Sequence, residues 1–369
     1  MKIEQDRIKI GEIPVAELAA KYGTPLYAYD EQKIRENYRR AVATFRKYYP
    51  DFRMFYAVKC CNNPAIVNIL RQEGAGADCA SVNEILLAKS VGITGENIMF
   101  SGNFLSDEDL RQGIETGAVI NLDDESLFPR LLKFGVPEVI SFRVNPGYGK
   151  SNVGEYVTNA GPKAKFGIHP DKVASAFRMA KDAGVKRFGV HMMTGSCITD
   201  AFRMAKEAGV KRFGVHMMTG SCITDADYFP FVTSLLMEIV GKTGKELGID
   251  FEFIDLGGGL GIPYEPGEAP LDLESAAKKT AEVFKTFVEK YGMKPPRLEM
   301  EPARYFVGNA GYVIGRVHAV KESYTRIVGT DVGMNVLVRP AFYGSYHHIY
   351  VDGKESEPRE NLGLCGQLC

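Results

Sequence analysis

The sequence predicts an α/β protein in which a (β/α)8 barrel of the TIM type is followed by an antiparallel β domain. Short β-rich runs alternate with amphipathic segments from about residue 30 to residue 305, as in parallel strands joined by crossover helices. Eight such runs precede the point where the helix pattern stops, and eight parallel strands close a barrel. At 369 residues, with 45% hydrophobic residues, the chain is long enough to bury a large core in two domains.

The eight predicted strands are short and rich in β-branched and aromatic residues, as strands usually are. In chain order they are FRMFYAVK (52–59), GADCAS (76–81), IMFSG (98–102), VINLD (119–123), VISFRVN (139–145), RFGVHMM (187–193), FEFIDLG (251–257) and RLEMEP (297–302).

Helix signals lie between these strands. Asp30 is placed to cap the helix that follows it, and Ser81 with Glu84 has the spacing of a capping box before the run ILLAKSVG. In the helix after Asp30, apolar residues recur at helical spacing and predict one stripe facing the barrel. These residues are Ile34, Tyr38, Ala41 and Phe45.

A tandem duplication adds a ninth strand signal. Residues 176–200 and 201–225 carry the same sequence and differ only at Asp182 and Glu207. Since eight strands close the barrel, we expect one copy to be displaced. The first copy is slightly favoured to stay, because its helix DKVASAFRMAKDAG is intact and the surplus then enters a loop after Asp200. The opposite choice stays open, because Asp200 could cap the shorter helix AFRMAKEAG.

Residues 30–305 are therefore expected to form the barrel, duplication included, and residues 1–29 with 306–369 the β domain. The runs YVIGRVHAV, TRIVGTDVG and HHIYVDG predict its strands, and RIKI near the N-terminus could join them. The chain stops about 60 residues past the barrel without a strand or helix to seal the sheet, so we expect this domain to be truncated at its C-terminus.

Composition favours small-molecule chemistry in the cytoplasm. The net charge is −1, from 45 basic and 46 acidic residues without long runs, so nucleic acid and anionic membranes are not expected partners. No apolar stretch has the length of a membrane helix, and the N-terminus lacks the apolar core of a signal peptide. The seven cysteines fit reduced thiols. Cys365 and Cys369 form a lone CxxxC, a weak zinc signal, and no metal is expected.

Candidate catalytic groups are those at the carboxyl ends of the strands, where active sites of such barrels lie. They include Lys59 at the end of the first strand, Asp78 in the second, and Glu301 and Arg304 at the end of the eighth. The glycines Gly257, Gly258 and Gly259 follow the seventh strand, where backbone N–H groups can approach an anion such as phosphate. Ser196, or its twin Ser221, offers a second such loop.

Seven short motifs stand in order along nearly the whole chain. They are YAVK (56–59), RVNP (143–146), KFG (165–167), TGS (194–196), DLGGGLG (255–261), EPAR (301–304) and RPAFYG (339–344). In this order and spacing the chain resembles the ornithine, diaminopimelate and arginine decarboxylase family, whose members have the alanine-racemase-like barrel of fold type III and use pyridoxal 5'-phosphate. Within that family it looks most similar to the diaminopimelate decarboxylases.

The resemblance implies a role for each motif. Lys59 would carry the cofactor as a Schiff base, in the same site as Asp78, and Glu301 would face the ring nitrogen. The phosphate would be held by Ser196 or Ser221, the glycines 257–259 and Arg304. Arg339 and Tyr343, with Arg304, would bind the far carboxylate of meso-diaminopimelate, which is decarboxylated to L-lysine. Cys369 would donate a proton across the interface of a homodimer with shared active sites.

Three departures from the family pattern keep alternatives open. Met193, or Met218 in the second copy, stands where a histidine usually stacks on the cofactor ring, and His191 shares the inward face two residues earlier. Ala303 replaces a glycine, and the acidic residue and tyrosine that follow the family cysteine are absent. A decarboxylase or racemase for another amino acid therefore remains an alternative, as does a non-catalytic relative that binds the cofactor.

Overall fold

The computed structural model describes residues 1–145, 147, 161–192, 198–207, 209, 212–218 and 220–368. The chain divides into two compact units. The barrel unit comprises Asn37–Gly261 and Leu271–Tyr305, and the β unit comprises Met1–Glu36, Ile262–Pro270 and Phe306–Cys369.

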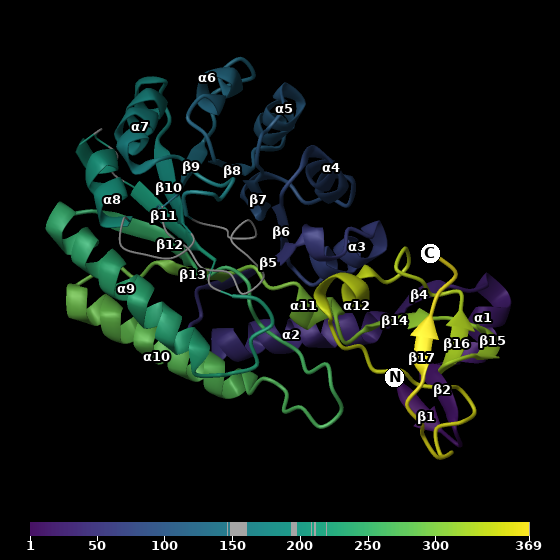
Figure 1. Cartoon of the computed structure of the whole chain (residues 1–369). Coiled ribbons are helices and arrows are strands. Elements are labelled where there is room, and N and C mark those ends of the chain that lie inside the picture. The colour runs from purple at the N-terminus through teal and green to yellow at the C-terminus, as the bar shows by residue number, and fades with distance from the viewer. Residues whose placement is uncertain are drawn as a thin grey trace. The chain divides into compact units, whose positions relative to one another are not determined.

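Parallel strands form a closed barrel in the barrel unit, which confirms the predicted fold class, but the strand count of eight is wrong. Nine strands close the cylinder in the order β10-β11-β12-β13-β5-β6-β7-β8-β9 (Figure 1). They are β5 (Phe52–Ala57), β6 (Gly76–Cys79), β7 (Ile98–Ser101), β8 (Val119–Leu122), β9 (Val139–Val144), β10 (Arg187–Met192), β11 (Arg212–Met217), β12 (Asp250–Asp255) and β13 (Arg297–Met300).

Both copies of the duplicated segment contribute a strand, so the expectation that one copy is displaced is also wrong. Strands β10 and β11 pair in parallel with identical residues opposite each other, from Phe188 opposite Phe213 to Met192 opposite Met217. The outer edge of β10 pairs with β9 and that of β11 with β12. Each copy is a complete helix-strand unit with the same inward and outward faces, so displacing either one would expose its buried phenylalanines.

Helices cover the outside of the barrel strands (Figure 1). Those of this layer are α3 (Pro64–Gln72), α4 (Val82–Ser90), α5 (Asp107–Thr116), α6 (Leu127–Leu131), α7 (Val173–Asp182), α8 (Ile198–Glu207), α9 (Tyr228–Leu247) and α10 (Leu273–Tyr291), and the layer is joined by most of α2 (Glu31–Tyr48) and the start of α11 (Arg304–Val307). Within the described part of the chain, none of the helices combines the length and the apolar character that spanning a bilayer requires.

The helix signals of the sequence are partly confirmed. Asp30 caps α2, because its Oδ1 accepts a hydrogen bond of 3.1 Å from the Lys33 N–H, and the predicted apolar stripe of α2 is buried. The capping box at Ser81 does not form. The Glu84 carboxylate accepts a hydrogen bond of 2.6 Å from Ala80 N–H instead of from Ser81, and the Val82 N–H at the start of α4 donates to Asp109 at 2.8 Å.

Three small sheets make up the β unit. One contains β1 (Lys2–Glu4), β2 (Arg7–Ile10) and β3 (Ile13–Pro14), and a second pairs β4 (Leu26–Tyr29) with β14 (Gly311–Ile314). The third contains β15 (Val317–Glu322), β16 (Arg326–Thr330) and β17 (Gly363–Cys365). All pairs are antiparallel except β16 with β17. Two helices belong to this unit, α1 (Val15–Tyr22) and α12 (Val338–Tyr343).

Two strand predictions in this unit need correction. The RIKI run is a strand, β2, but it pairs within the N-terminal sheet and does not join the later strands. The HHIYVDG run forms no strand. Its end is held by hydrogen bonds to the N-terminal hairpin, since Asp352 Oδ1 accepts from the Ile8 N–H at 2.8 Å and the Gly353 N–H donates to the Asp6 carbonyl at 2.7 Å. These hydrogen bonds satisfy polar groups of the segment that a neighbouring strand would otherwise have to pair.

Candidate active site

Lys59 lies two residues beyond the end of β5, in the 3-10 helix Val58–Cys60. Its Nζ is 3.1 Å from Oδ2 of Asp78, which lies on the neighbouring strand β6 opposite Ala57. The Asp78 charge raises the pKa of Lys59, Glu301 adds to this, and together they outweigh the opposing effect of burial. Lys59 is therefore held as an ammonium group.

Asp78 is buried, whereas about half of the Lys59 side chain is exposed. Burial raises the pKa of Asp78, and the negative charge of Glu301 raises it further, while Lys59 and His216 act in the opposite direction. A carboxylate in this position accepts a proton more readily than an exposed one. Lys59 keeps its proton, and Asp78 is the counter-ion of the ammonium group.

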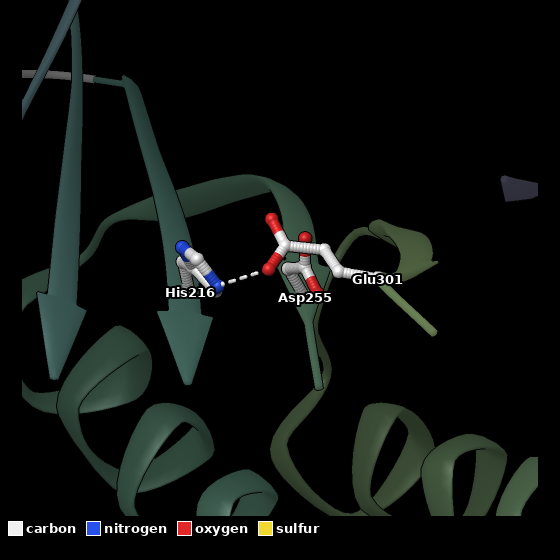
Figure 2. Close-up of side chains that lie close together, drawn as sticks. All are labelled: His216, Asp255 and Glu301. Atoms are coloured by element: carbon white, nitrogen blue, oxygen red, sulfur yellow. Dashed lines mark ion pairs between the residues drawn. The ribbon is translucent and has the colours of Figure 1, made fainter. Parts of the chain in front are cut away.

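A second cluster lies inside the barrel and consists of His216, Asp255 and Glu301. Figure 2 shows the three side chains pointing toward one another. His216 on β11 stands opposite Asp255 on β12, and Glu301 follows β13. Nε2 of His216 is 2.9 Å from Oε2 of Glu301, and one ligand-type atom of each residue lies within 4.8 Å of the others.

The charges of this cluster are unequal. Burial and the neighbouring Glu301 raise the pKa of Asp255 well above its usual value, so Asp255 is the neutral carboxyl. Burial acts on Glu301 in the same direction, but His216, Lys59 and Asp255 together bring the pKa of Glu301 below its usual value. Glu301 therefore carries the negative charge, and its Oε1 is buried with no hydrogen-bond partner among the described residues.

The twin histidine His191 lies beside His216 but has other neighbours. The two rings are stacked, with centroids 3.9 Å apart and planes 15° apart. Nδ1 of His191 lies 2.9 Å from Nδ2 of Asn121. Because an amide nitrogen only donates, Nδ1 is the acceptor and the proton of the ring is on Nε2. Burial is the main cause that lowers the pKa of His191, so this ring is neutral.

The glycine loop after β12 packs closely on the second repeat copy. A Cβ on Gly257 would lie 2.3 Å from the Met217 carbonyl oxygen, and Gly257 has φ +72°, so only glycine fits there. The Gly257 carbonyl accepts a hydrogen bond of 2.8 Å from the Glu301 N–H, which ties the loop to the end of β13. The loop, Met217 and Glu301 are thus held together by backbone contacts.

Arg304 and Ser221 come together beside this loop. Nη2 of Arg304 donates a hydrogen bond of 3.4 Å to Oγ of Ser221, which belongs to the second repeat copy. The backbone of Gly259 is also close, since a Cβ added there would lie 3.4 Å from the Gly220 carbonyl oxygen. A guanidinium, a hydroxyl and a glycine loop are groups that bind an oxyanion.

Arg339 and Tyr343 lie in α12 of the β unit. The Arg339 guanidinium donates to Ser345 Oγ at 3.0 Å and stacks over the Tyr264 ring, 5.5 Å from its centroid. Tyr343 is 58% exposed and its ring meets that of Phe342 edge to face. The two predicted substrate-binding residues therefore lie four positions apart on the same helix, and Ser345 and Tyr264 orient the Arg339 side chain.

Ser196, Met193 and Cys369 lie outside the described residues. Met218, the twin of Met193, is half-buried and its backbone is next to Gly257. The sequence reasoning missed His216 and Asp255 as members of the site. The signal was present for His216, because it is the copy of His191 and strand alternation turns it inward.

Comparisons with known proteins agree with this arrangement. The family model described as "Pyridoxal-dependent decarboxylase, pyridoxal binding domain" matches residues 33–206 and then residues 201–308. The second match thus begins at the first residue of the second repeat copy.

Similar proteins cover nearly all of the chain. The diaminopimelate decarboxylase of Methanothermobacter thermautotrophicus is 39% identical over 99% of this chain and 80% of its own length. That of Thermoplasma acidophilum is 36% identical over 98% of this chain and 79% of its own length. The crystal structure of the M. jannaschii diaminopimelate decarboxylase with L-lysine matches with a TM-score of 0.80 at 31% identity, over 100% of this chain and 81% of that one.

Proposed function

The chain belongs to the pyridoxal-dependent decarboxylase family, and from that premise we propose that it converts meso-diaminopimelate to L-lysine and CO2 with pyridoxal 5'-phosphate on Lys59. One observation supports the site more than any other. An amine paired with a carboxylate, Lys59 with Asp78, lies near a buried and ionised Glu301, and this supports the proposal.

The residues of the barrel unit fit the cofactor. Glu301 Oε1 is a buried acceptor without a partner among the described residues, which suits the N–H of a protonated pyridine ring. Ser221, Arg304 and the glycines 257–259 suit the phosphate. When bound, pyridoxal phosphate supplies an electron sink for the charge left on the α-carbon by departing CO2.

Asp78 is the counter-ion that holds the Lys59 amine at this end of the barrel. The two groups are 3.1 Å apart, and the charge of Asp78 raises the pKa of Lys59. Lys59 must lose its proton before it can act as a nucleophile, and solvent can take that proton because about half of the side chain is exposed.

The choice of substrate rests on Arg339 and Tyr343, which stand in the family positions for the far carboxylate. A guanidinium that is already oriented by Ser345 and Tyr264 suits a carboxylate, whereas a diamine substrate would require an acidic residue. We also propose that the protein works in the cytoplasm as a homodimer in which Cys369 of one subunit serves the site of the other.

The proposal is tested by incubating the purified chain with pyridoxal phosphate and meso-diaminopimelate. CO2 and L-lysine should appear in equal amounts, and Lys59→Ala should give neither. L-Ornithine, L-arginine and L-lysine serve as competing substrates, and chiral analysis of recovered amino acid detects racemisation. A chain that binds the cofactor but releases no CO2 from diaminopimelate would contradict the proposal, as would faster release from ornithine.

A further inference from the structure

We propose that His216, contributed by the second repeat copy, is the positioning residue for Glu301, and that its twin His191 has no part in this role. The inference rests on the proposed function, because Glu301 is the residue that would meet the ring nitrogen of the cofactor. It adds a residue that the sequence did not single out and assigns different tasks to two copies of one sequence.

The geometry carries the first step. His216 and Glu301 are both about 95% buried, and Nε2 of the histidine is 2.9 Å from Oε2 of the glutamate. His216 is thus the ion-pair partner of one carboxylate oxygen, and the other, Oε1, is a buried acceptor without a hydrogen-bond partner among the described residues. A carboxylate fixed at one oxygen presents the second in a defined direction, which is what binding a ring N–H requires.

The charged groups around Glu301 explain why this carboxylate needs His216 as a partner. The charged or titratable groups that act on Glu301 or are acted on by it are Lys59, Asp78, His216, Asp255 and Glu299. The negative charges of Asp78 and Glu299 favour a protonated Glu301, whereas His216, Lys59 and the neutral Asp255 act in the opposite direction. His216 forms the ion pair with Glu301, so it holds the carboxylate both in place and ionised.

His191 has an identical local sequence but a different position in the barrel. It lies one strand farther from β13, and its Nδ1 accepts from Asn121 at 2.9 Å. Its ring stacks on that of His216, and it is His216 that forms the ion pair with Glu301. The insertion of a second strand therefore places one histidine against Asn121 and the other against Glu301.

The identity of the two copies offers a matched pair of variants, His216→Phe and His191→Phe. Each replaces a nitrogen ring by a carbon ring of similar shape in the same sequence context, so stacking is kept. His216→Gln returns an N–H near the position of Nε2, whereas His216→Asn is too short to do so. Two properties are measured: the carboxyl titration of Glu301 by 13C NMR in the cofactor-free protein, assigned by the signal lost in Glu301→Gln, and the affinity for pyridoxal phosphate.

His216→Phe should move the Glu301 titration to higher pH and weaken cofactor binding about 10- to 100-fold, a range typical of losing a close contact to a charged group. His216→Gln should restore part of both. His191→Phe should leave the titration in place and change affinity by about twofold or less. If His216→Phe does not fold, His216→Asn gives the same test.

An unmoved titration in the His216 variants, or an equal shift in His191→Phe, overturns the inference. The titration does not involve the cofactor, so failure of the parent chain to bind pyridoxal phosphate would refute the proposed function and leave this test intact.

Discussion

Replacing Phe213 by alanine tests whether the second repeat copy is part of the barrel. Phe213 on β11 is fully buried, and its ring centroid is 5.4 Å from that of Phe202 and 6.4 Å from that of Phe251. Phe202 lies on the helix of the same copy and Phe251 on the next strand. Removing the ring leaves a cavity between three elements, and buried Phe→Ala changes cost about 3–5 kcal/mol.

The duplication supplies the comparison. Phe188, the twin of Phe213 on β10, is 3% exposed and its ring lies 5.9 Å from that of Phe177. Phe188→Ala should therefore lower the free energy of unfolding by a similar amount. Phe231 lies on the outer face of α9 and is 59% exposed. The free energy of unfolding of Phe231→Ala should therefore stay within about 0.5 kcal/mol of that of the parent.

The measurement is urea unfolding followed by circular dichroism, with the slope of the free energy against urea compared among the three variants. A change of midpoint at constant slope reports stability alone. If either Phe213→Ala or Phe188→Ala stays within about 0.5 kcal/mol of the parent, that strand is not in the core, and the nine-stranded barrel is wrong.

Three further predictions follow from single side chains. Burial raises the pKa of Asp123 from 3.8 to about 6, so the folded state holds this proton more tightly than the unfolded chain and loses stability as pH rises through that interval. Asp123→Asn should be more stable than the parent by about 2–3 kcal/mol at pH 7, and this gain should shrink toward pH 4. Urea unfolding at both pH values measures the gain, and an equal gain at both would contradict the prediction. Arg187, 19% exposed and paired with both Glu96 and Glu252, should cost about 1–3 kcal/mol in the same assay when changed to alanine, and an unchanged midpoint would refute this. Arg339→Gln should raise KM for diaminopimelate about tenfold or more while cofactor absorbance stays unchanged, whereas loss of the cofactor would show a different role.

Strand positions were predictable because their signals are local. Each of the eight predicted runs coincides with an observed strand to within one residue at its start, as FRMFYAVK does with β5, because alternating or continuous apolar residues define a strand within a few residues. The HHIYVDG run has the same local character and forms no strand. Whether a run pairs depends on what its backbone meets, here the N-terminal hairpin, and no local pattern records that.

The number of strands was not predictable from the same reasoning. Eight is the usual count for a closed barrel, and the sequence alone gave no measure of how much a barrel can widen. The structure shows that a duplicated helix-strand unit brings its own covering helix, α8, and its own buried residues such as Phe202. Such a unit fits beside its twin because neighbouring parallel strands present the same faces.

Part of the site was predictable from the sequence, and the part that was missed depends on the number of strands. Lys59, Asp78 and Glu301 were placed together because parallel strands bring their carboxyl ends to one face of the barrel. His216 and Asp255 face each other across two neighbouring strands, β11 and β12, and that neighbourhood exists only if the second copy is in the barrel. Once one copy was expected to be displaced, the pairing of His216 with Glu301 could not be foreseen.

The central claim is that the Lys59 amine carries the cofactor. The full chain is loaded with pyridoxal phosphate, reduced with borohydride and digested, and the peptide bearing the reduced cofactor is sequenced by mass spectrometry. The label should be found on Lys59, within the peptide around YAVKCCNNP, and Lys59→Ala should yield no labelled peptide. A label on another lysine, or a chain that takes up no cofactor under conditions where it is folded, would contradict the account.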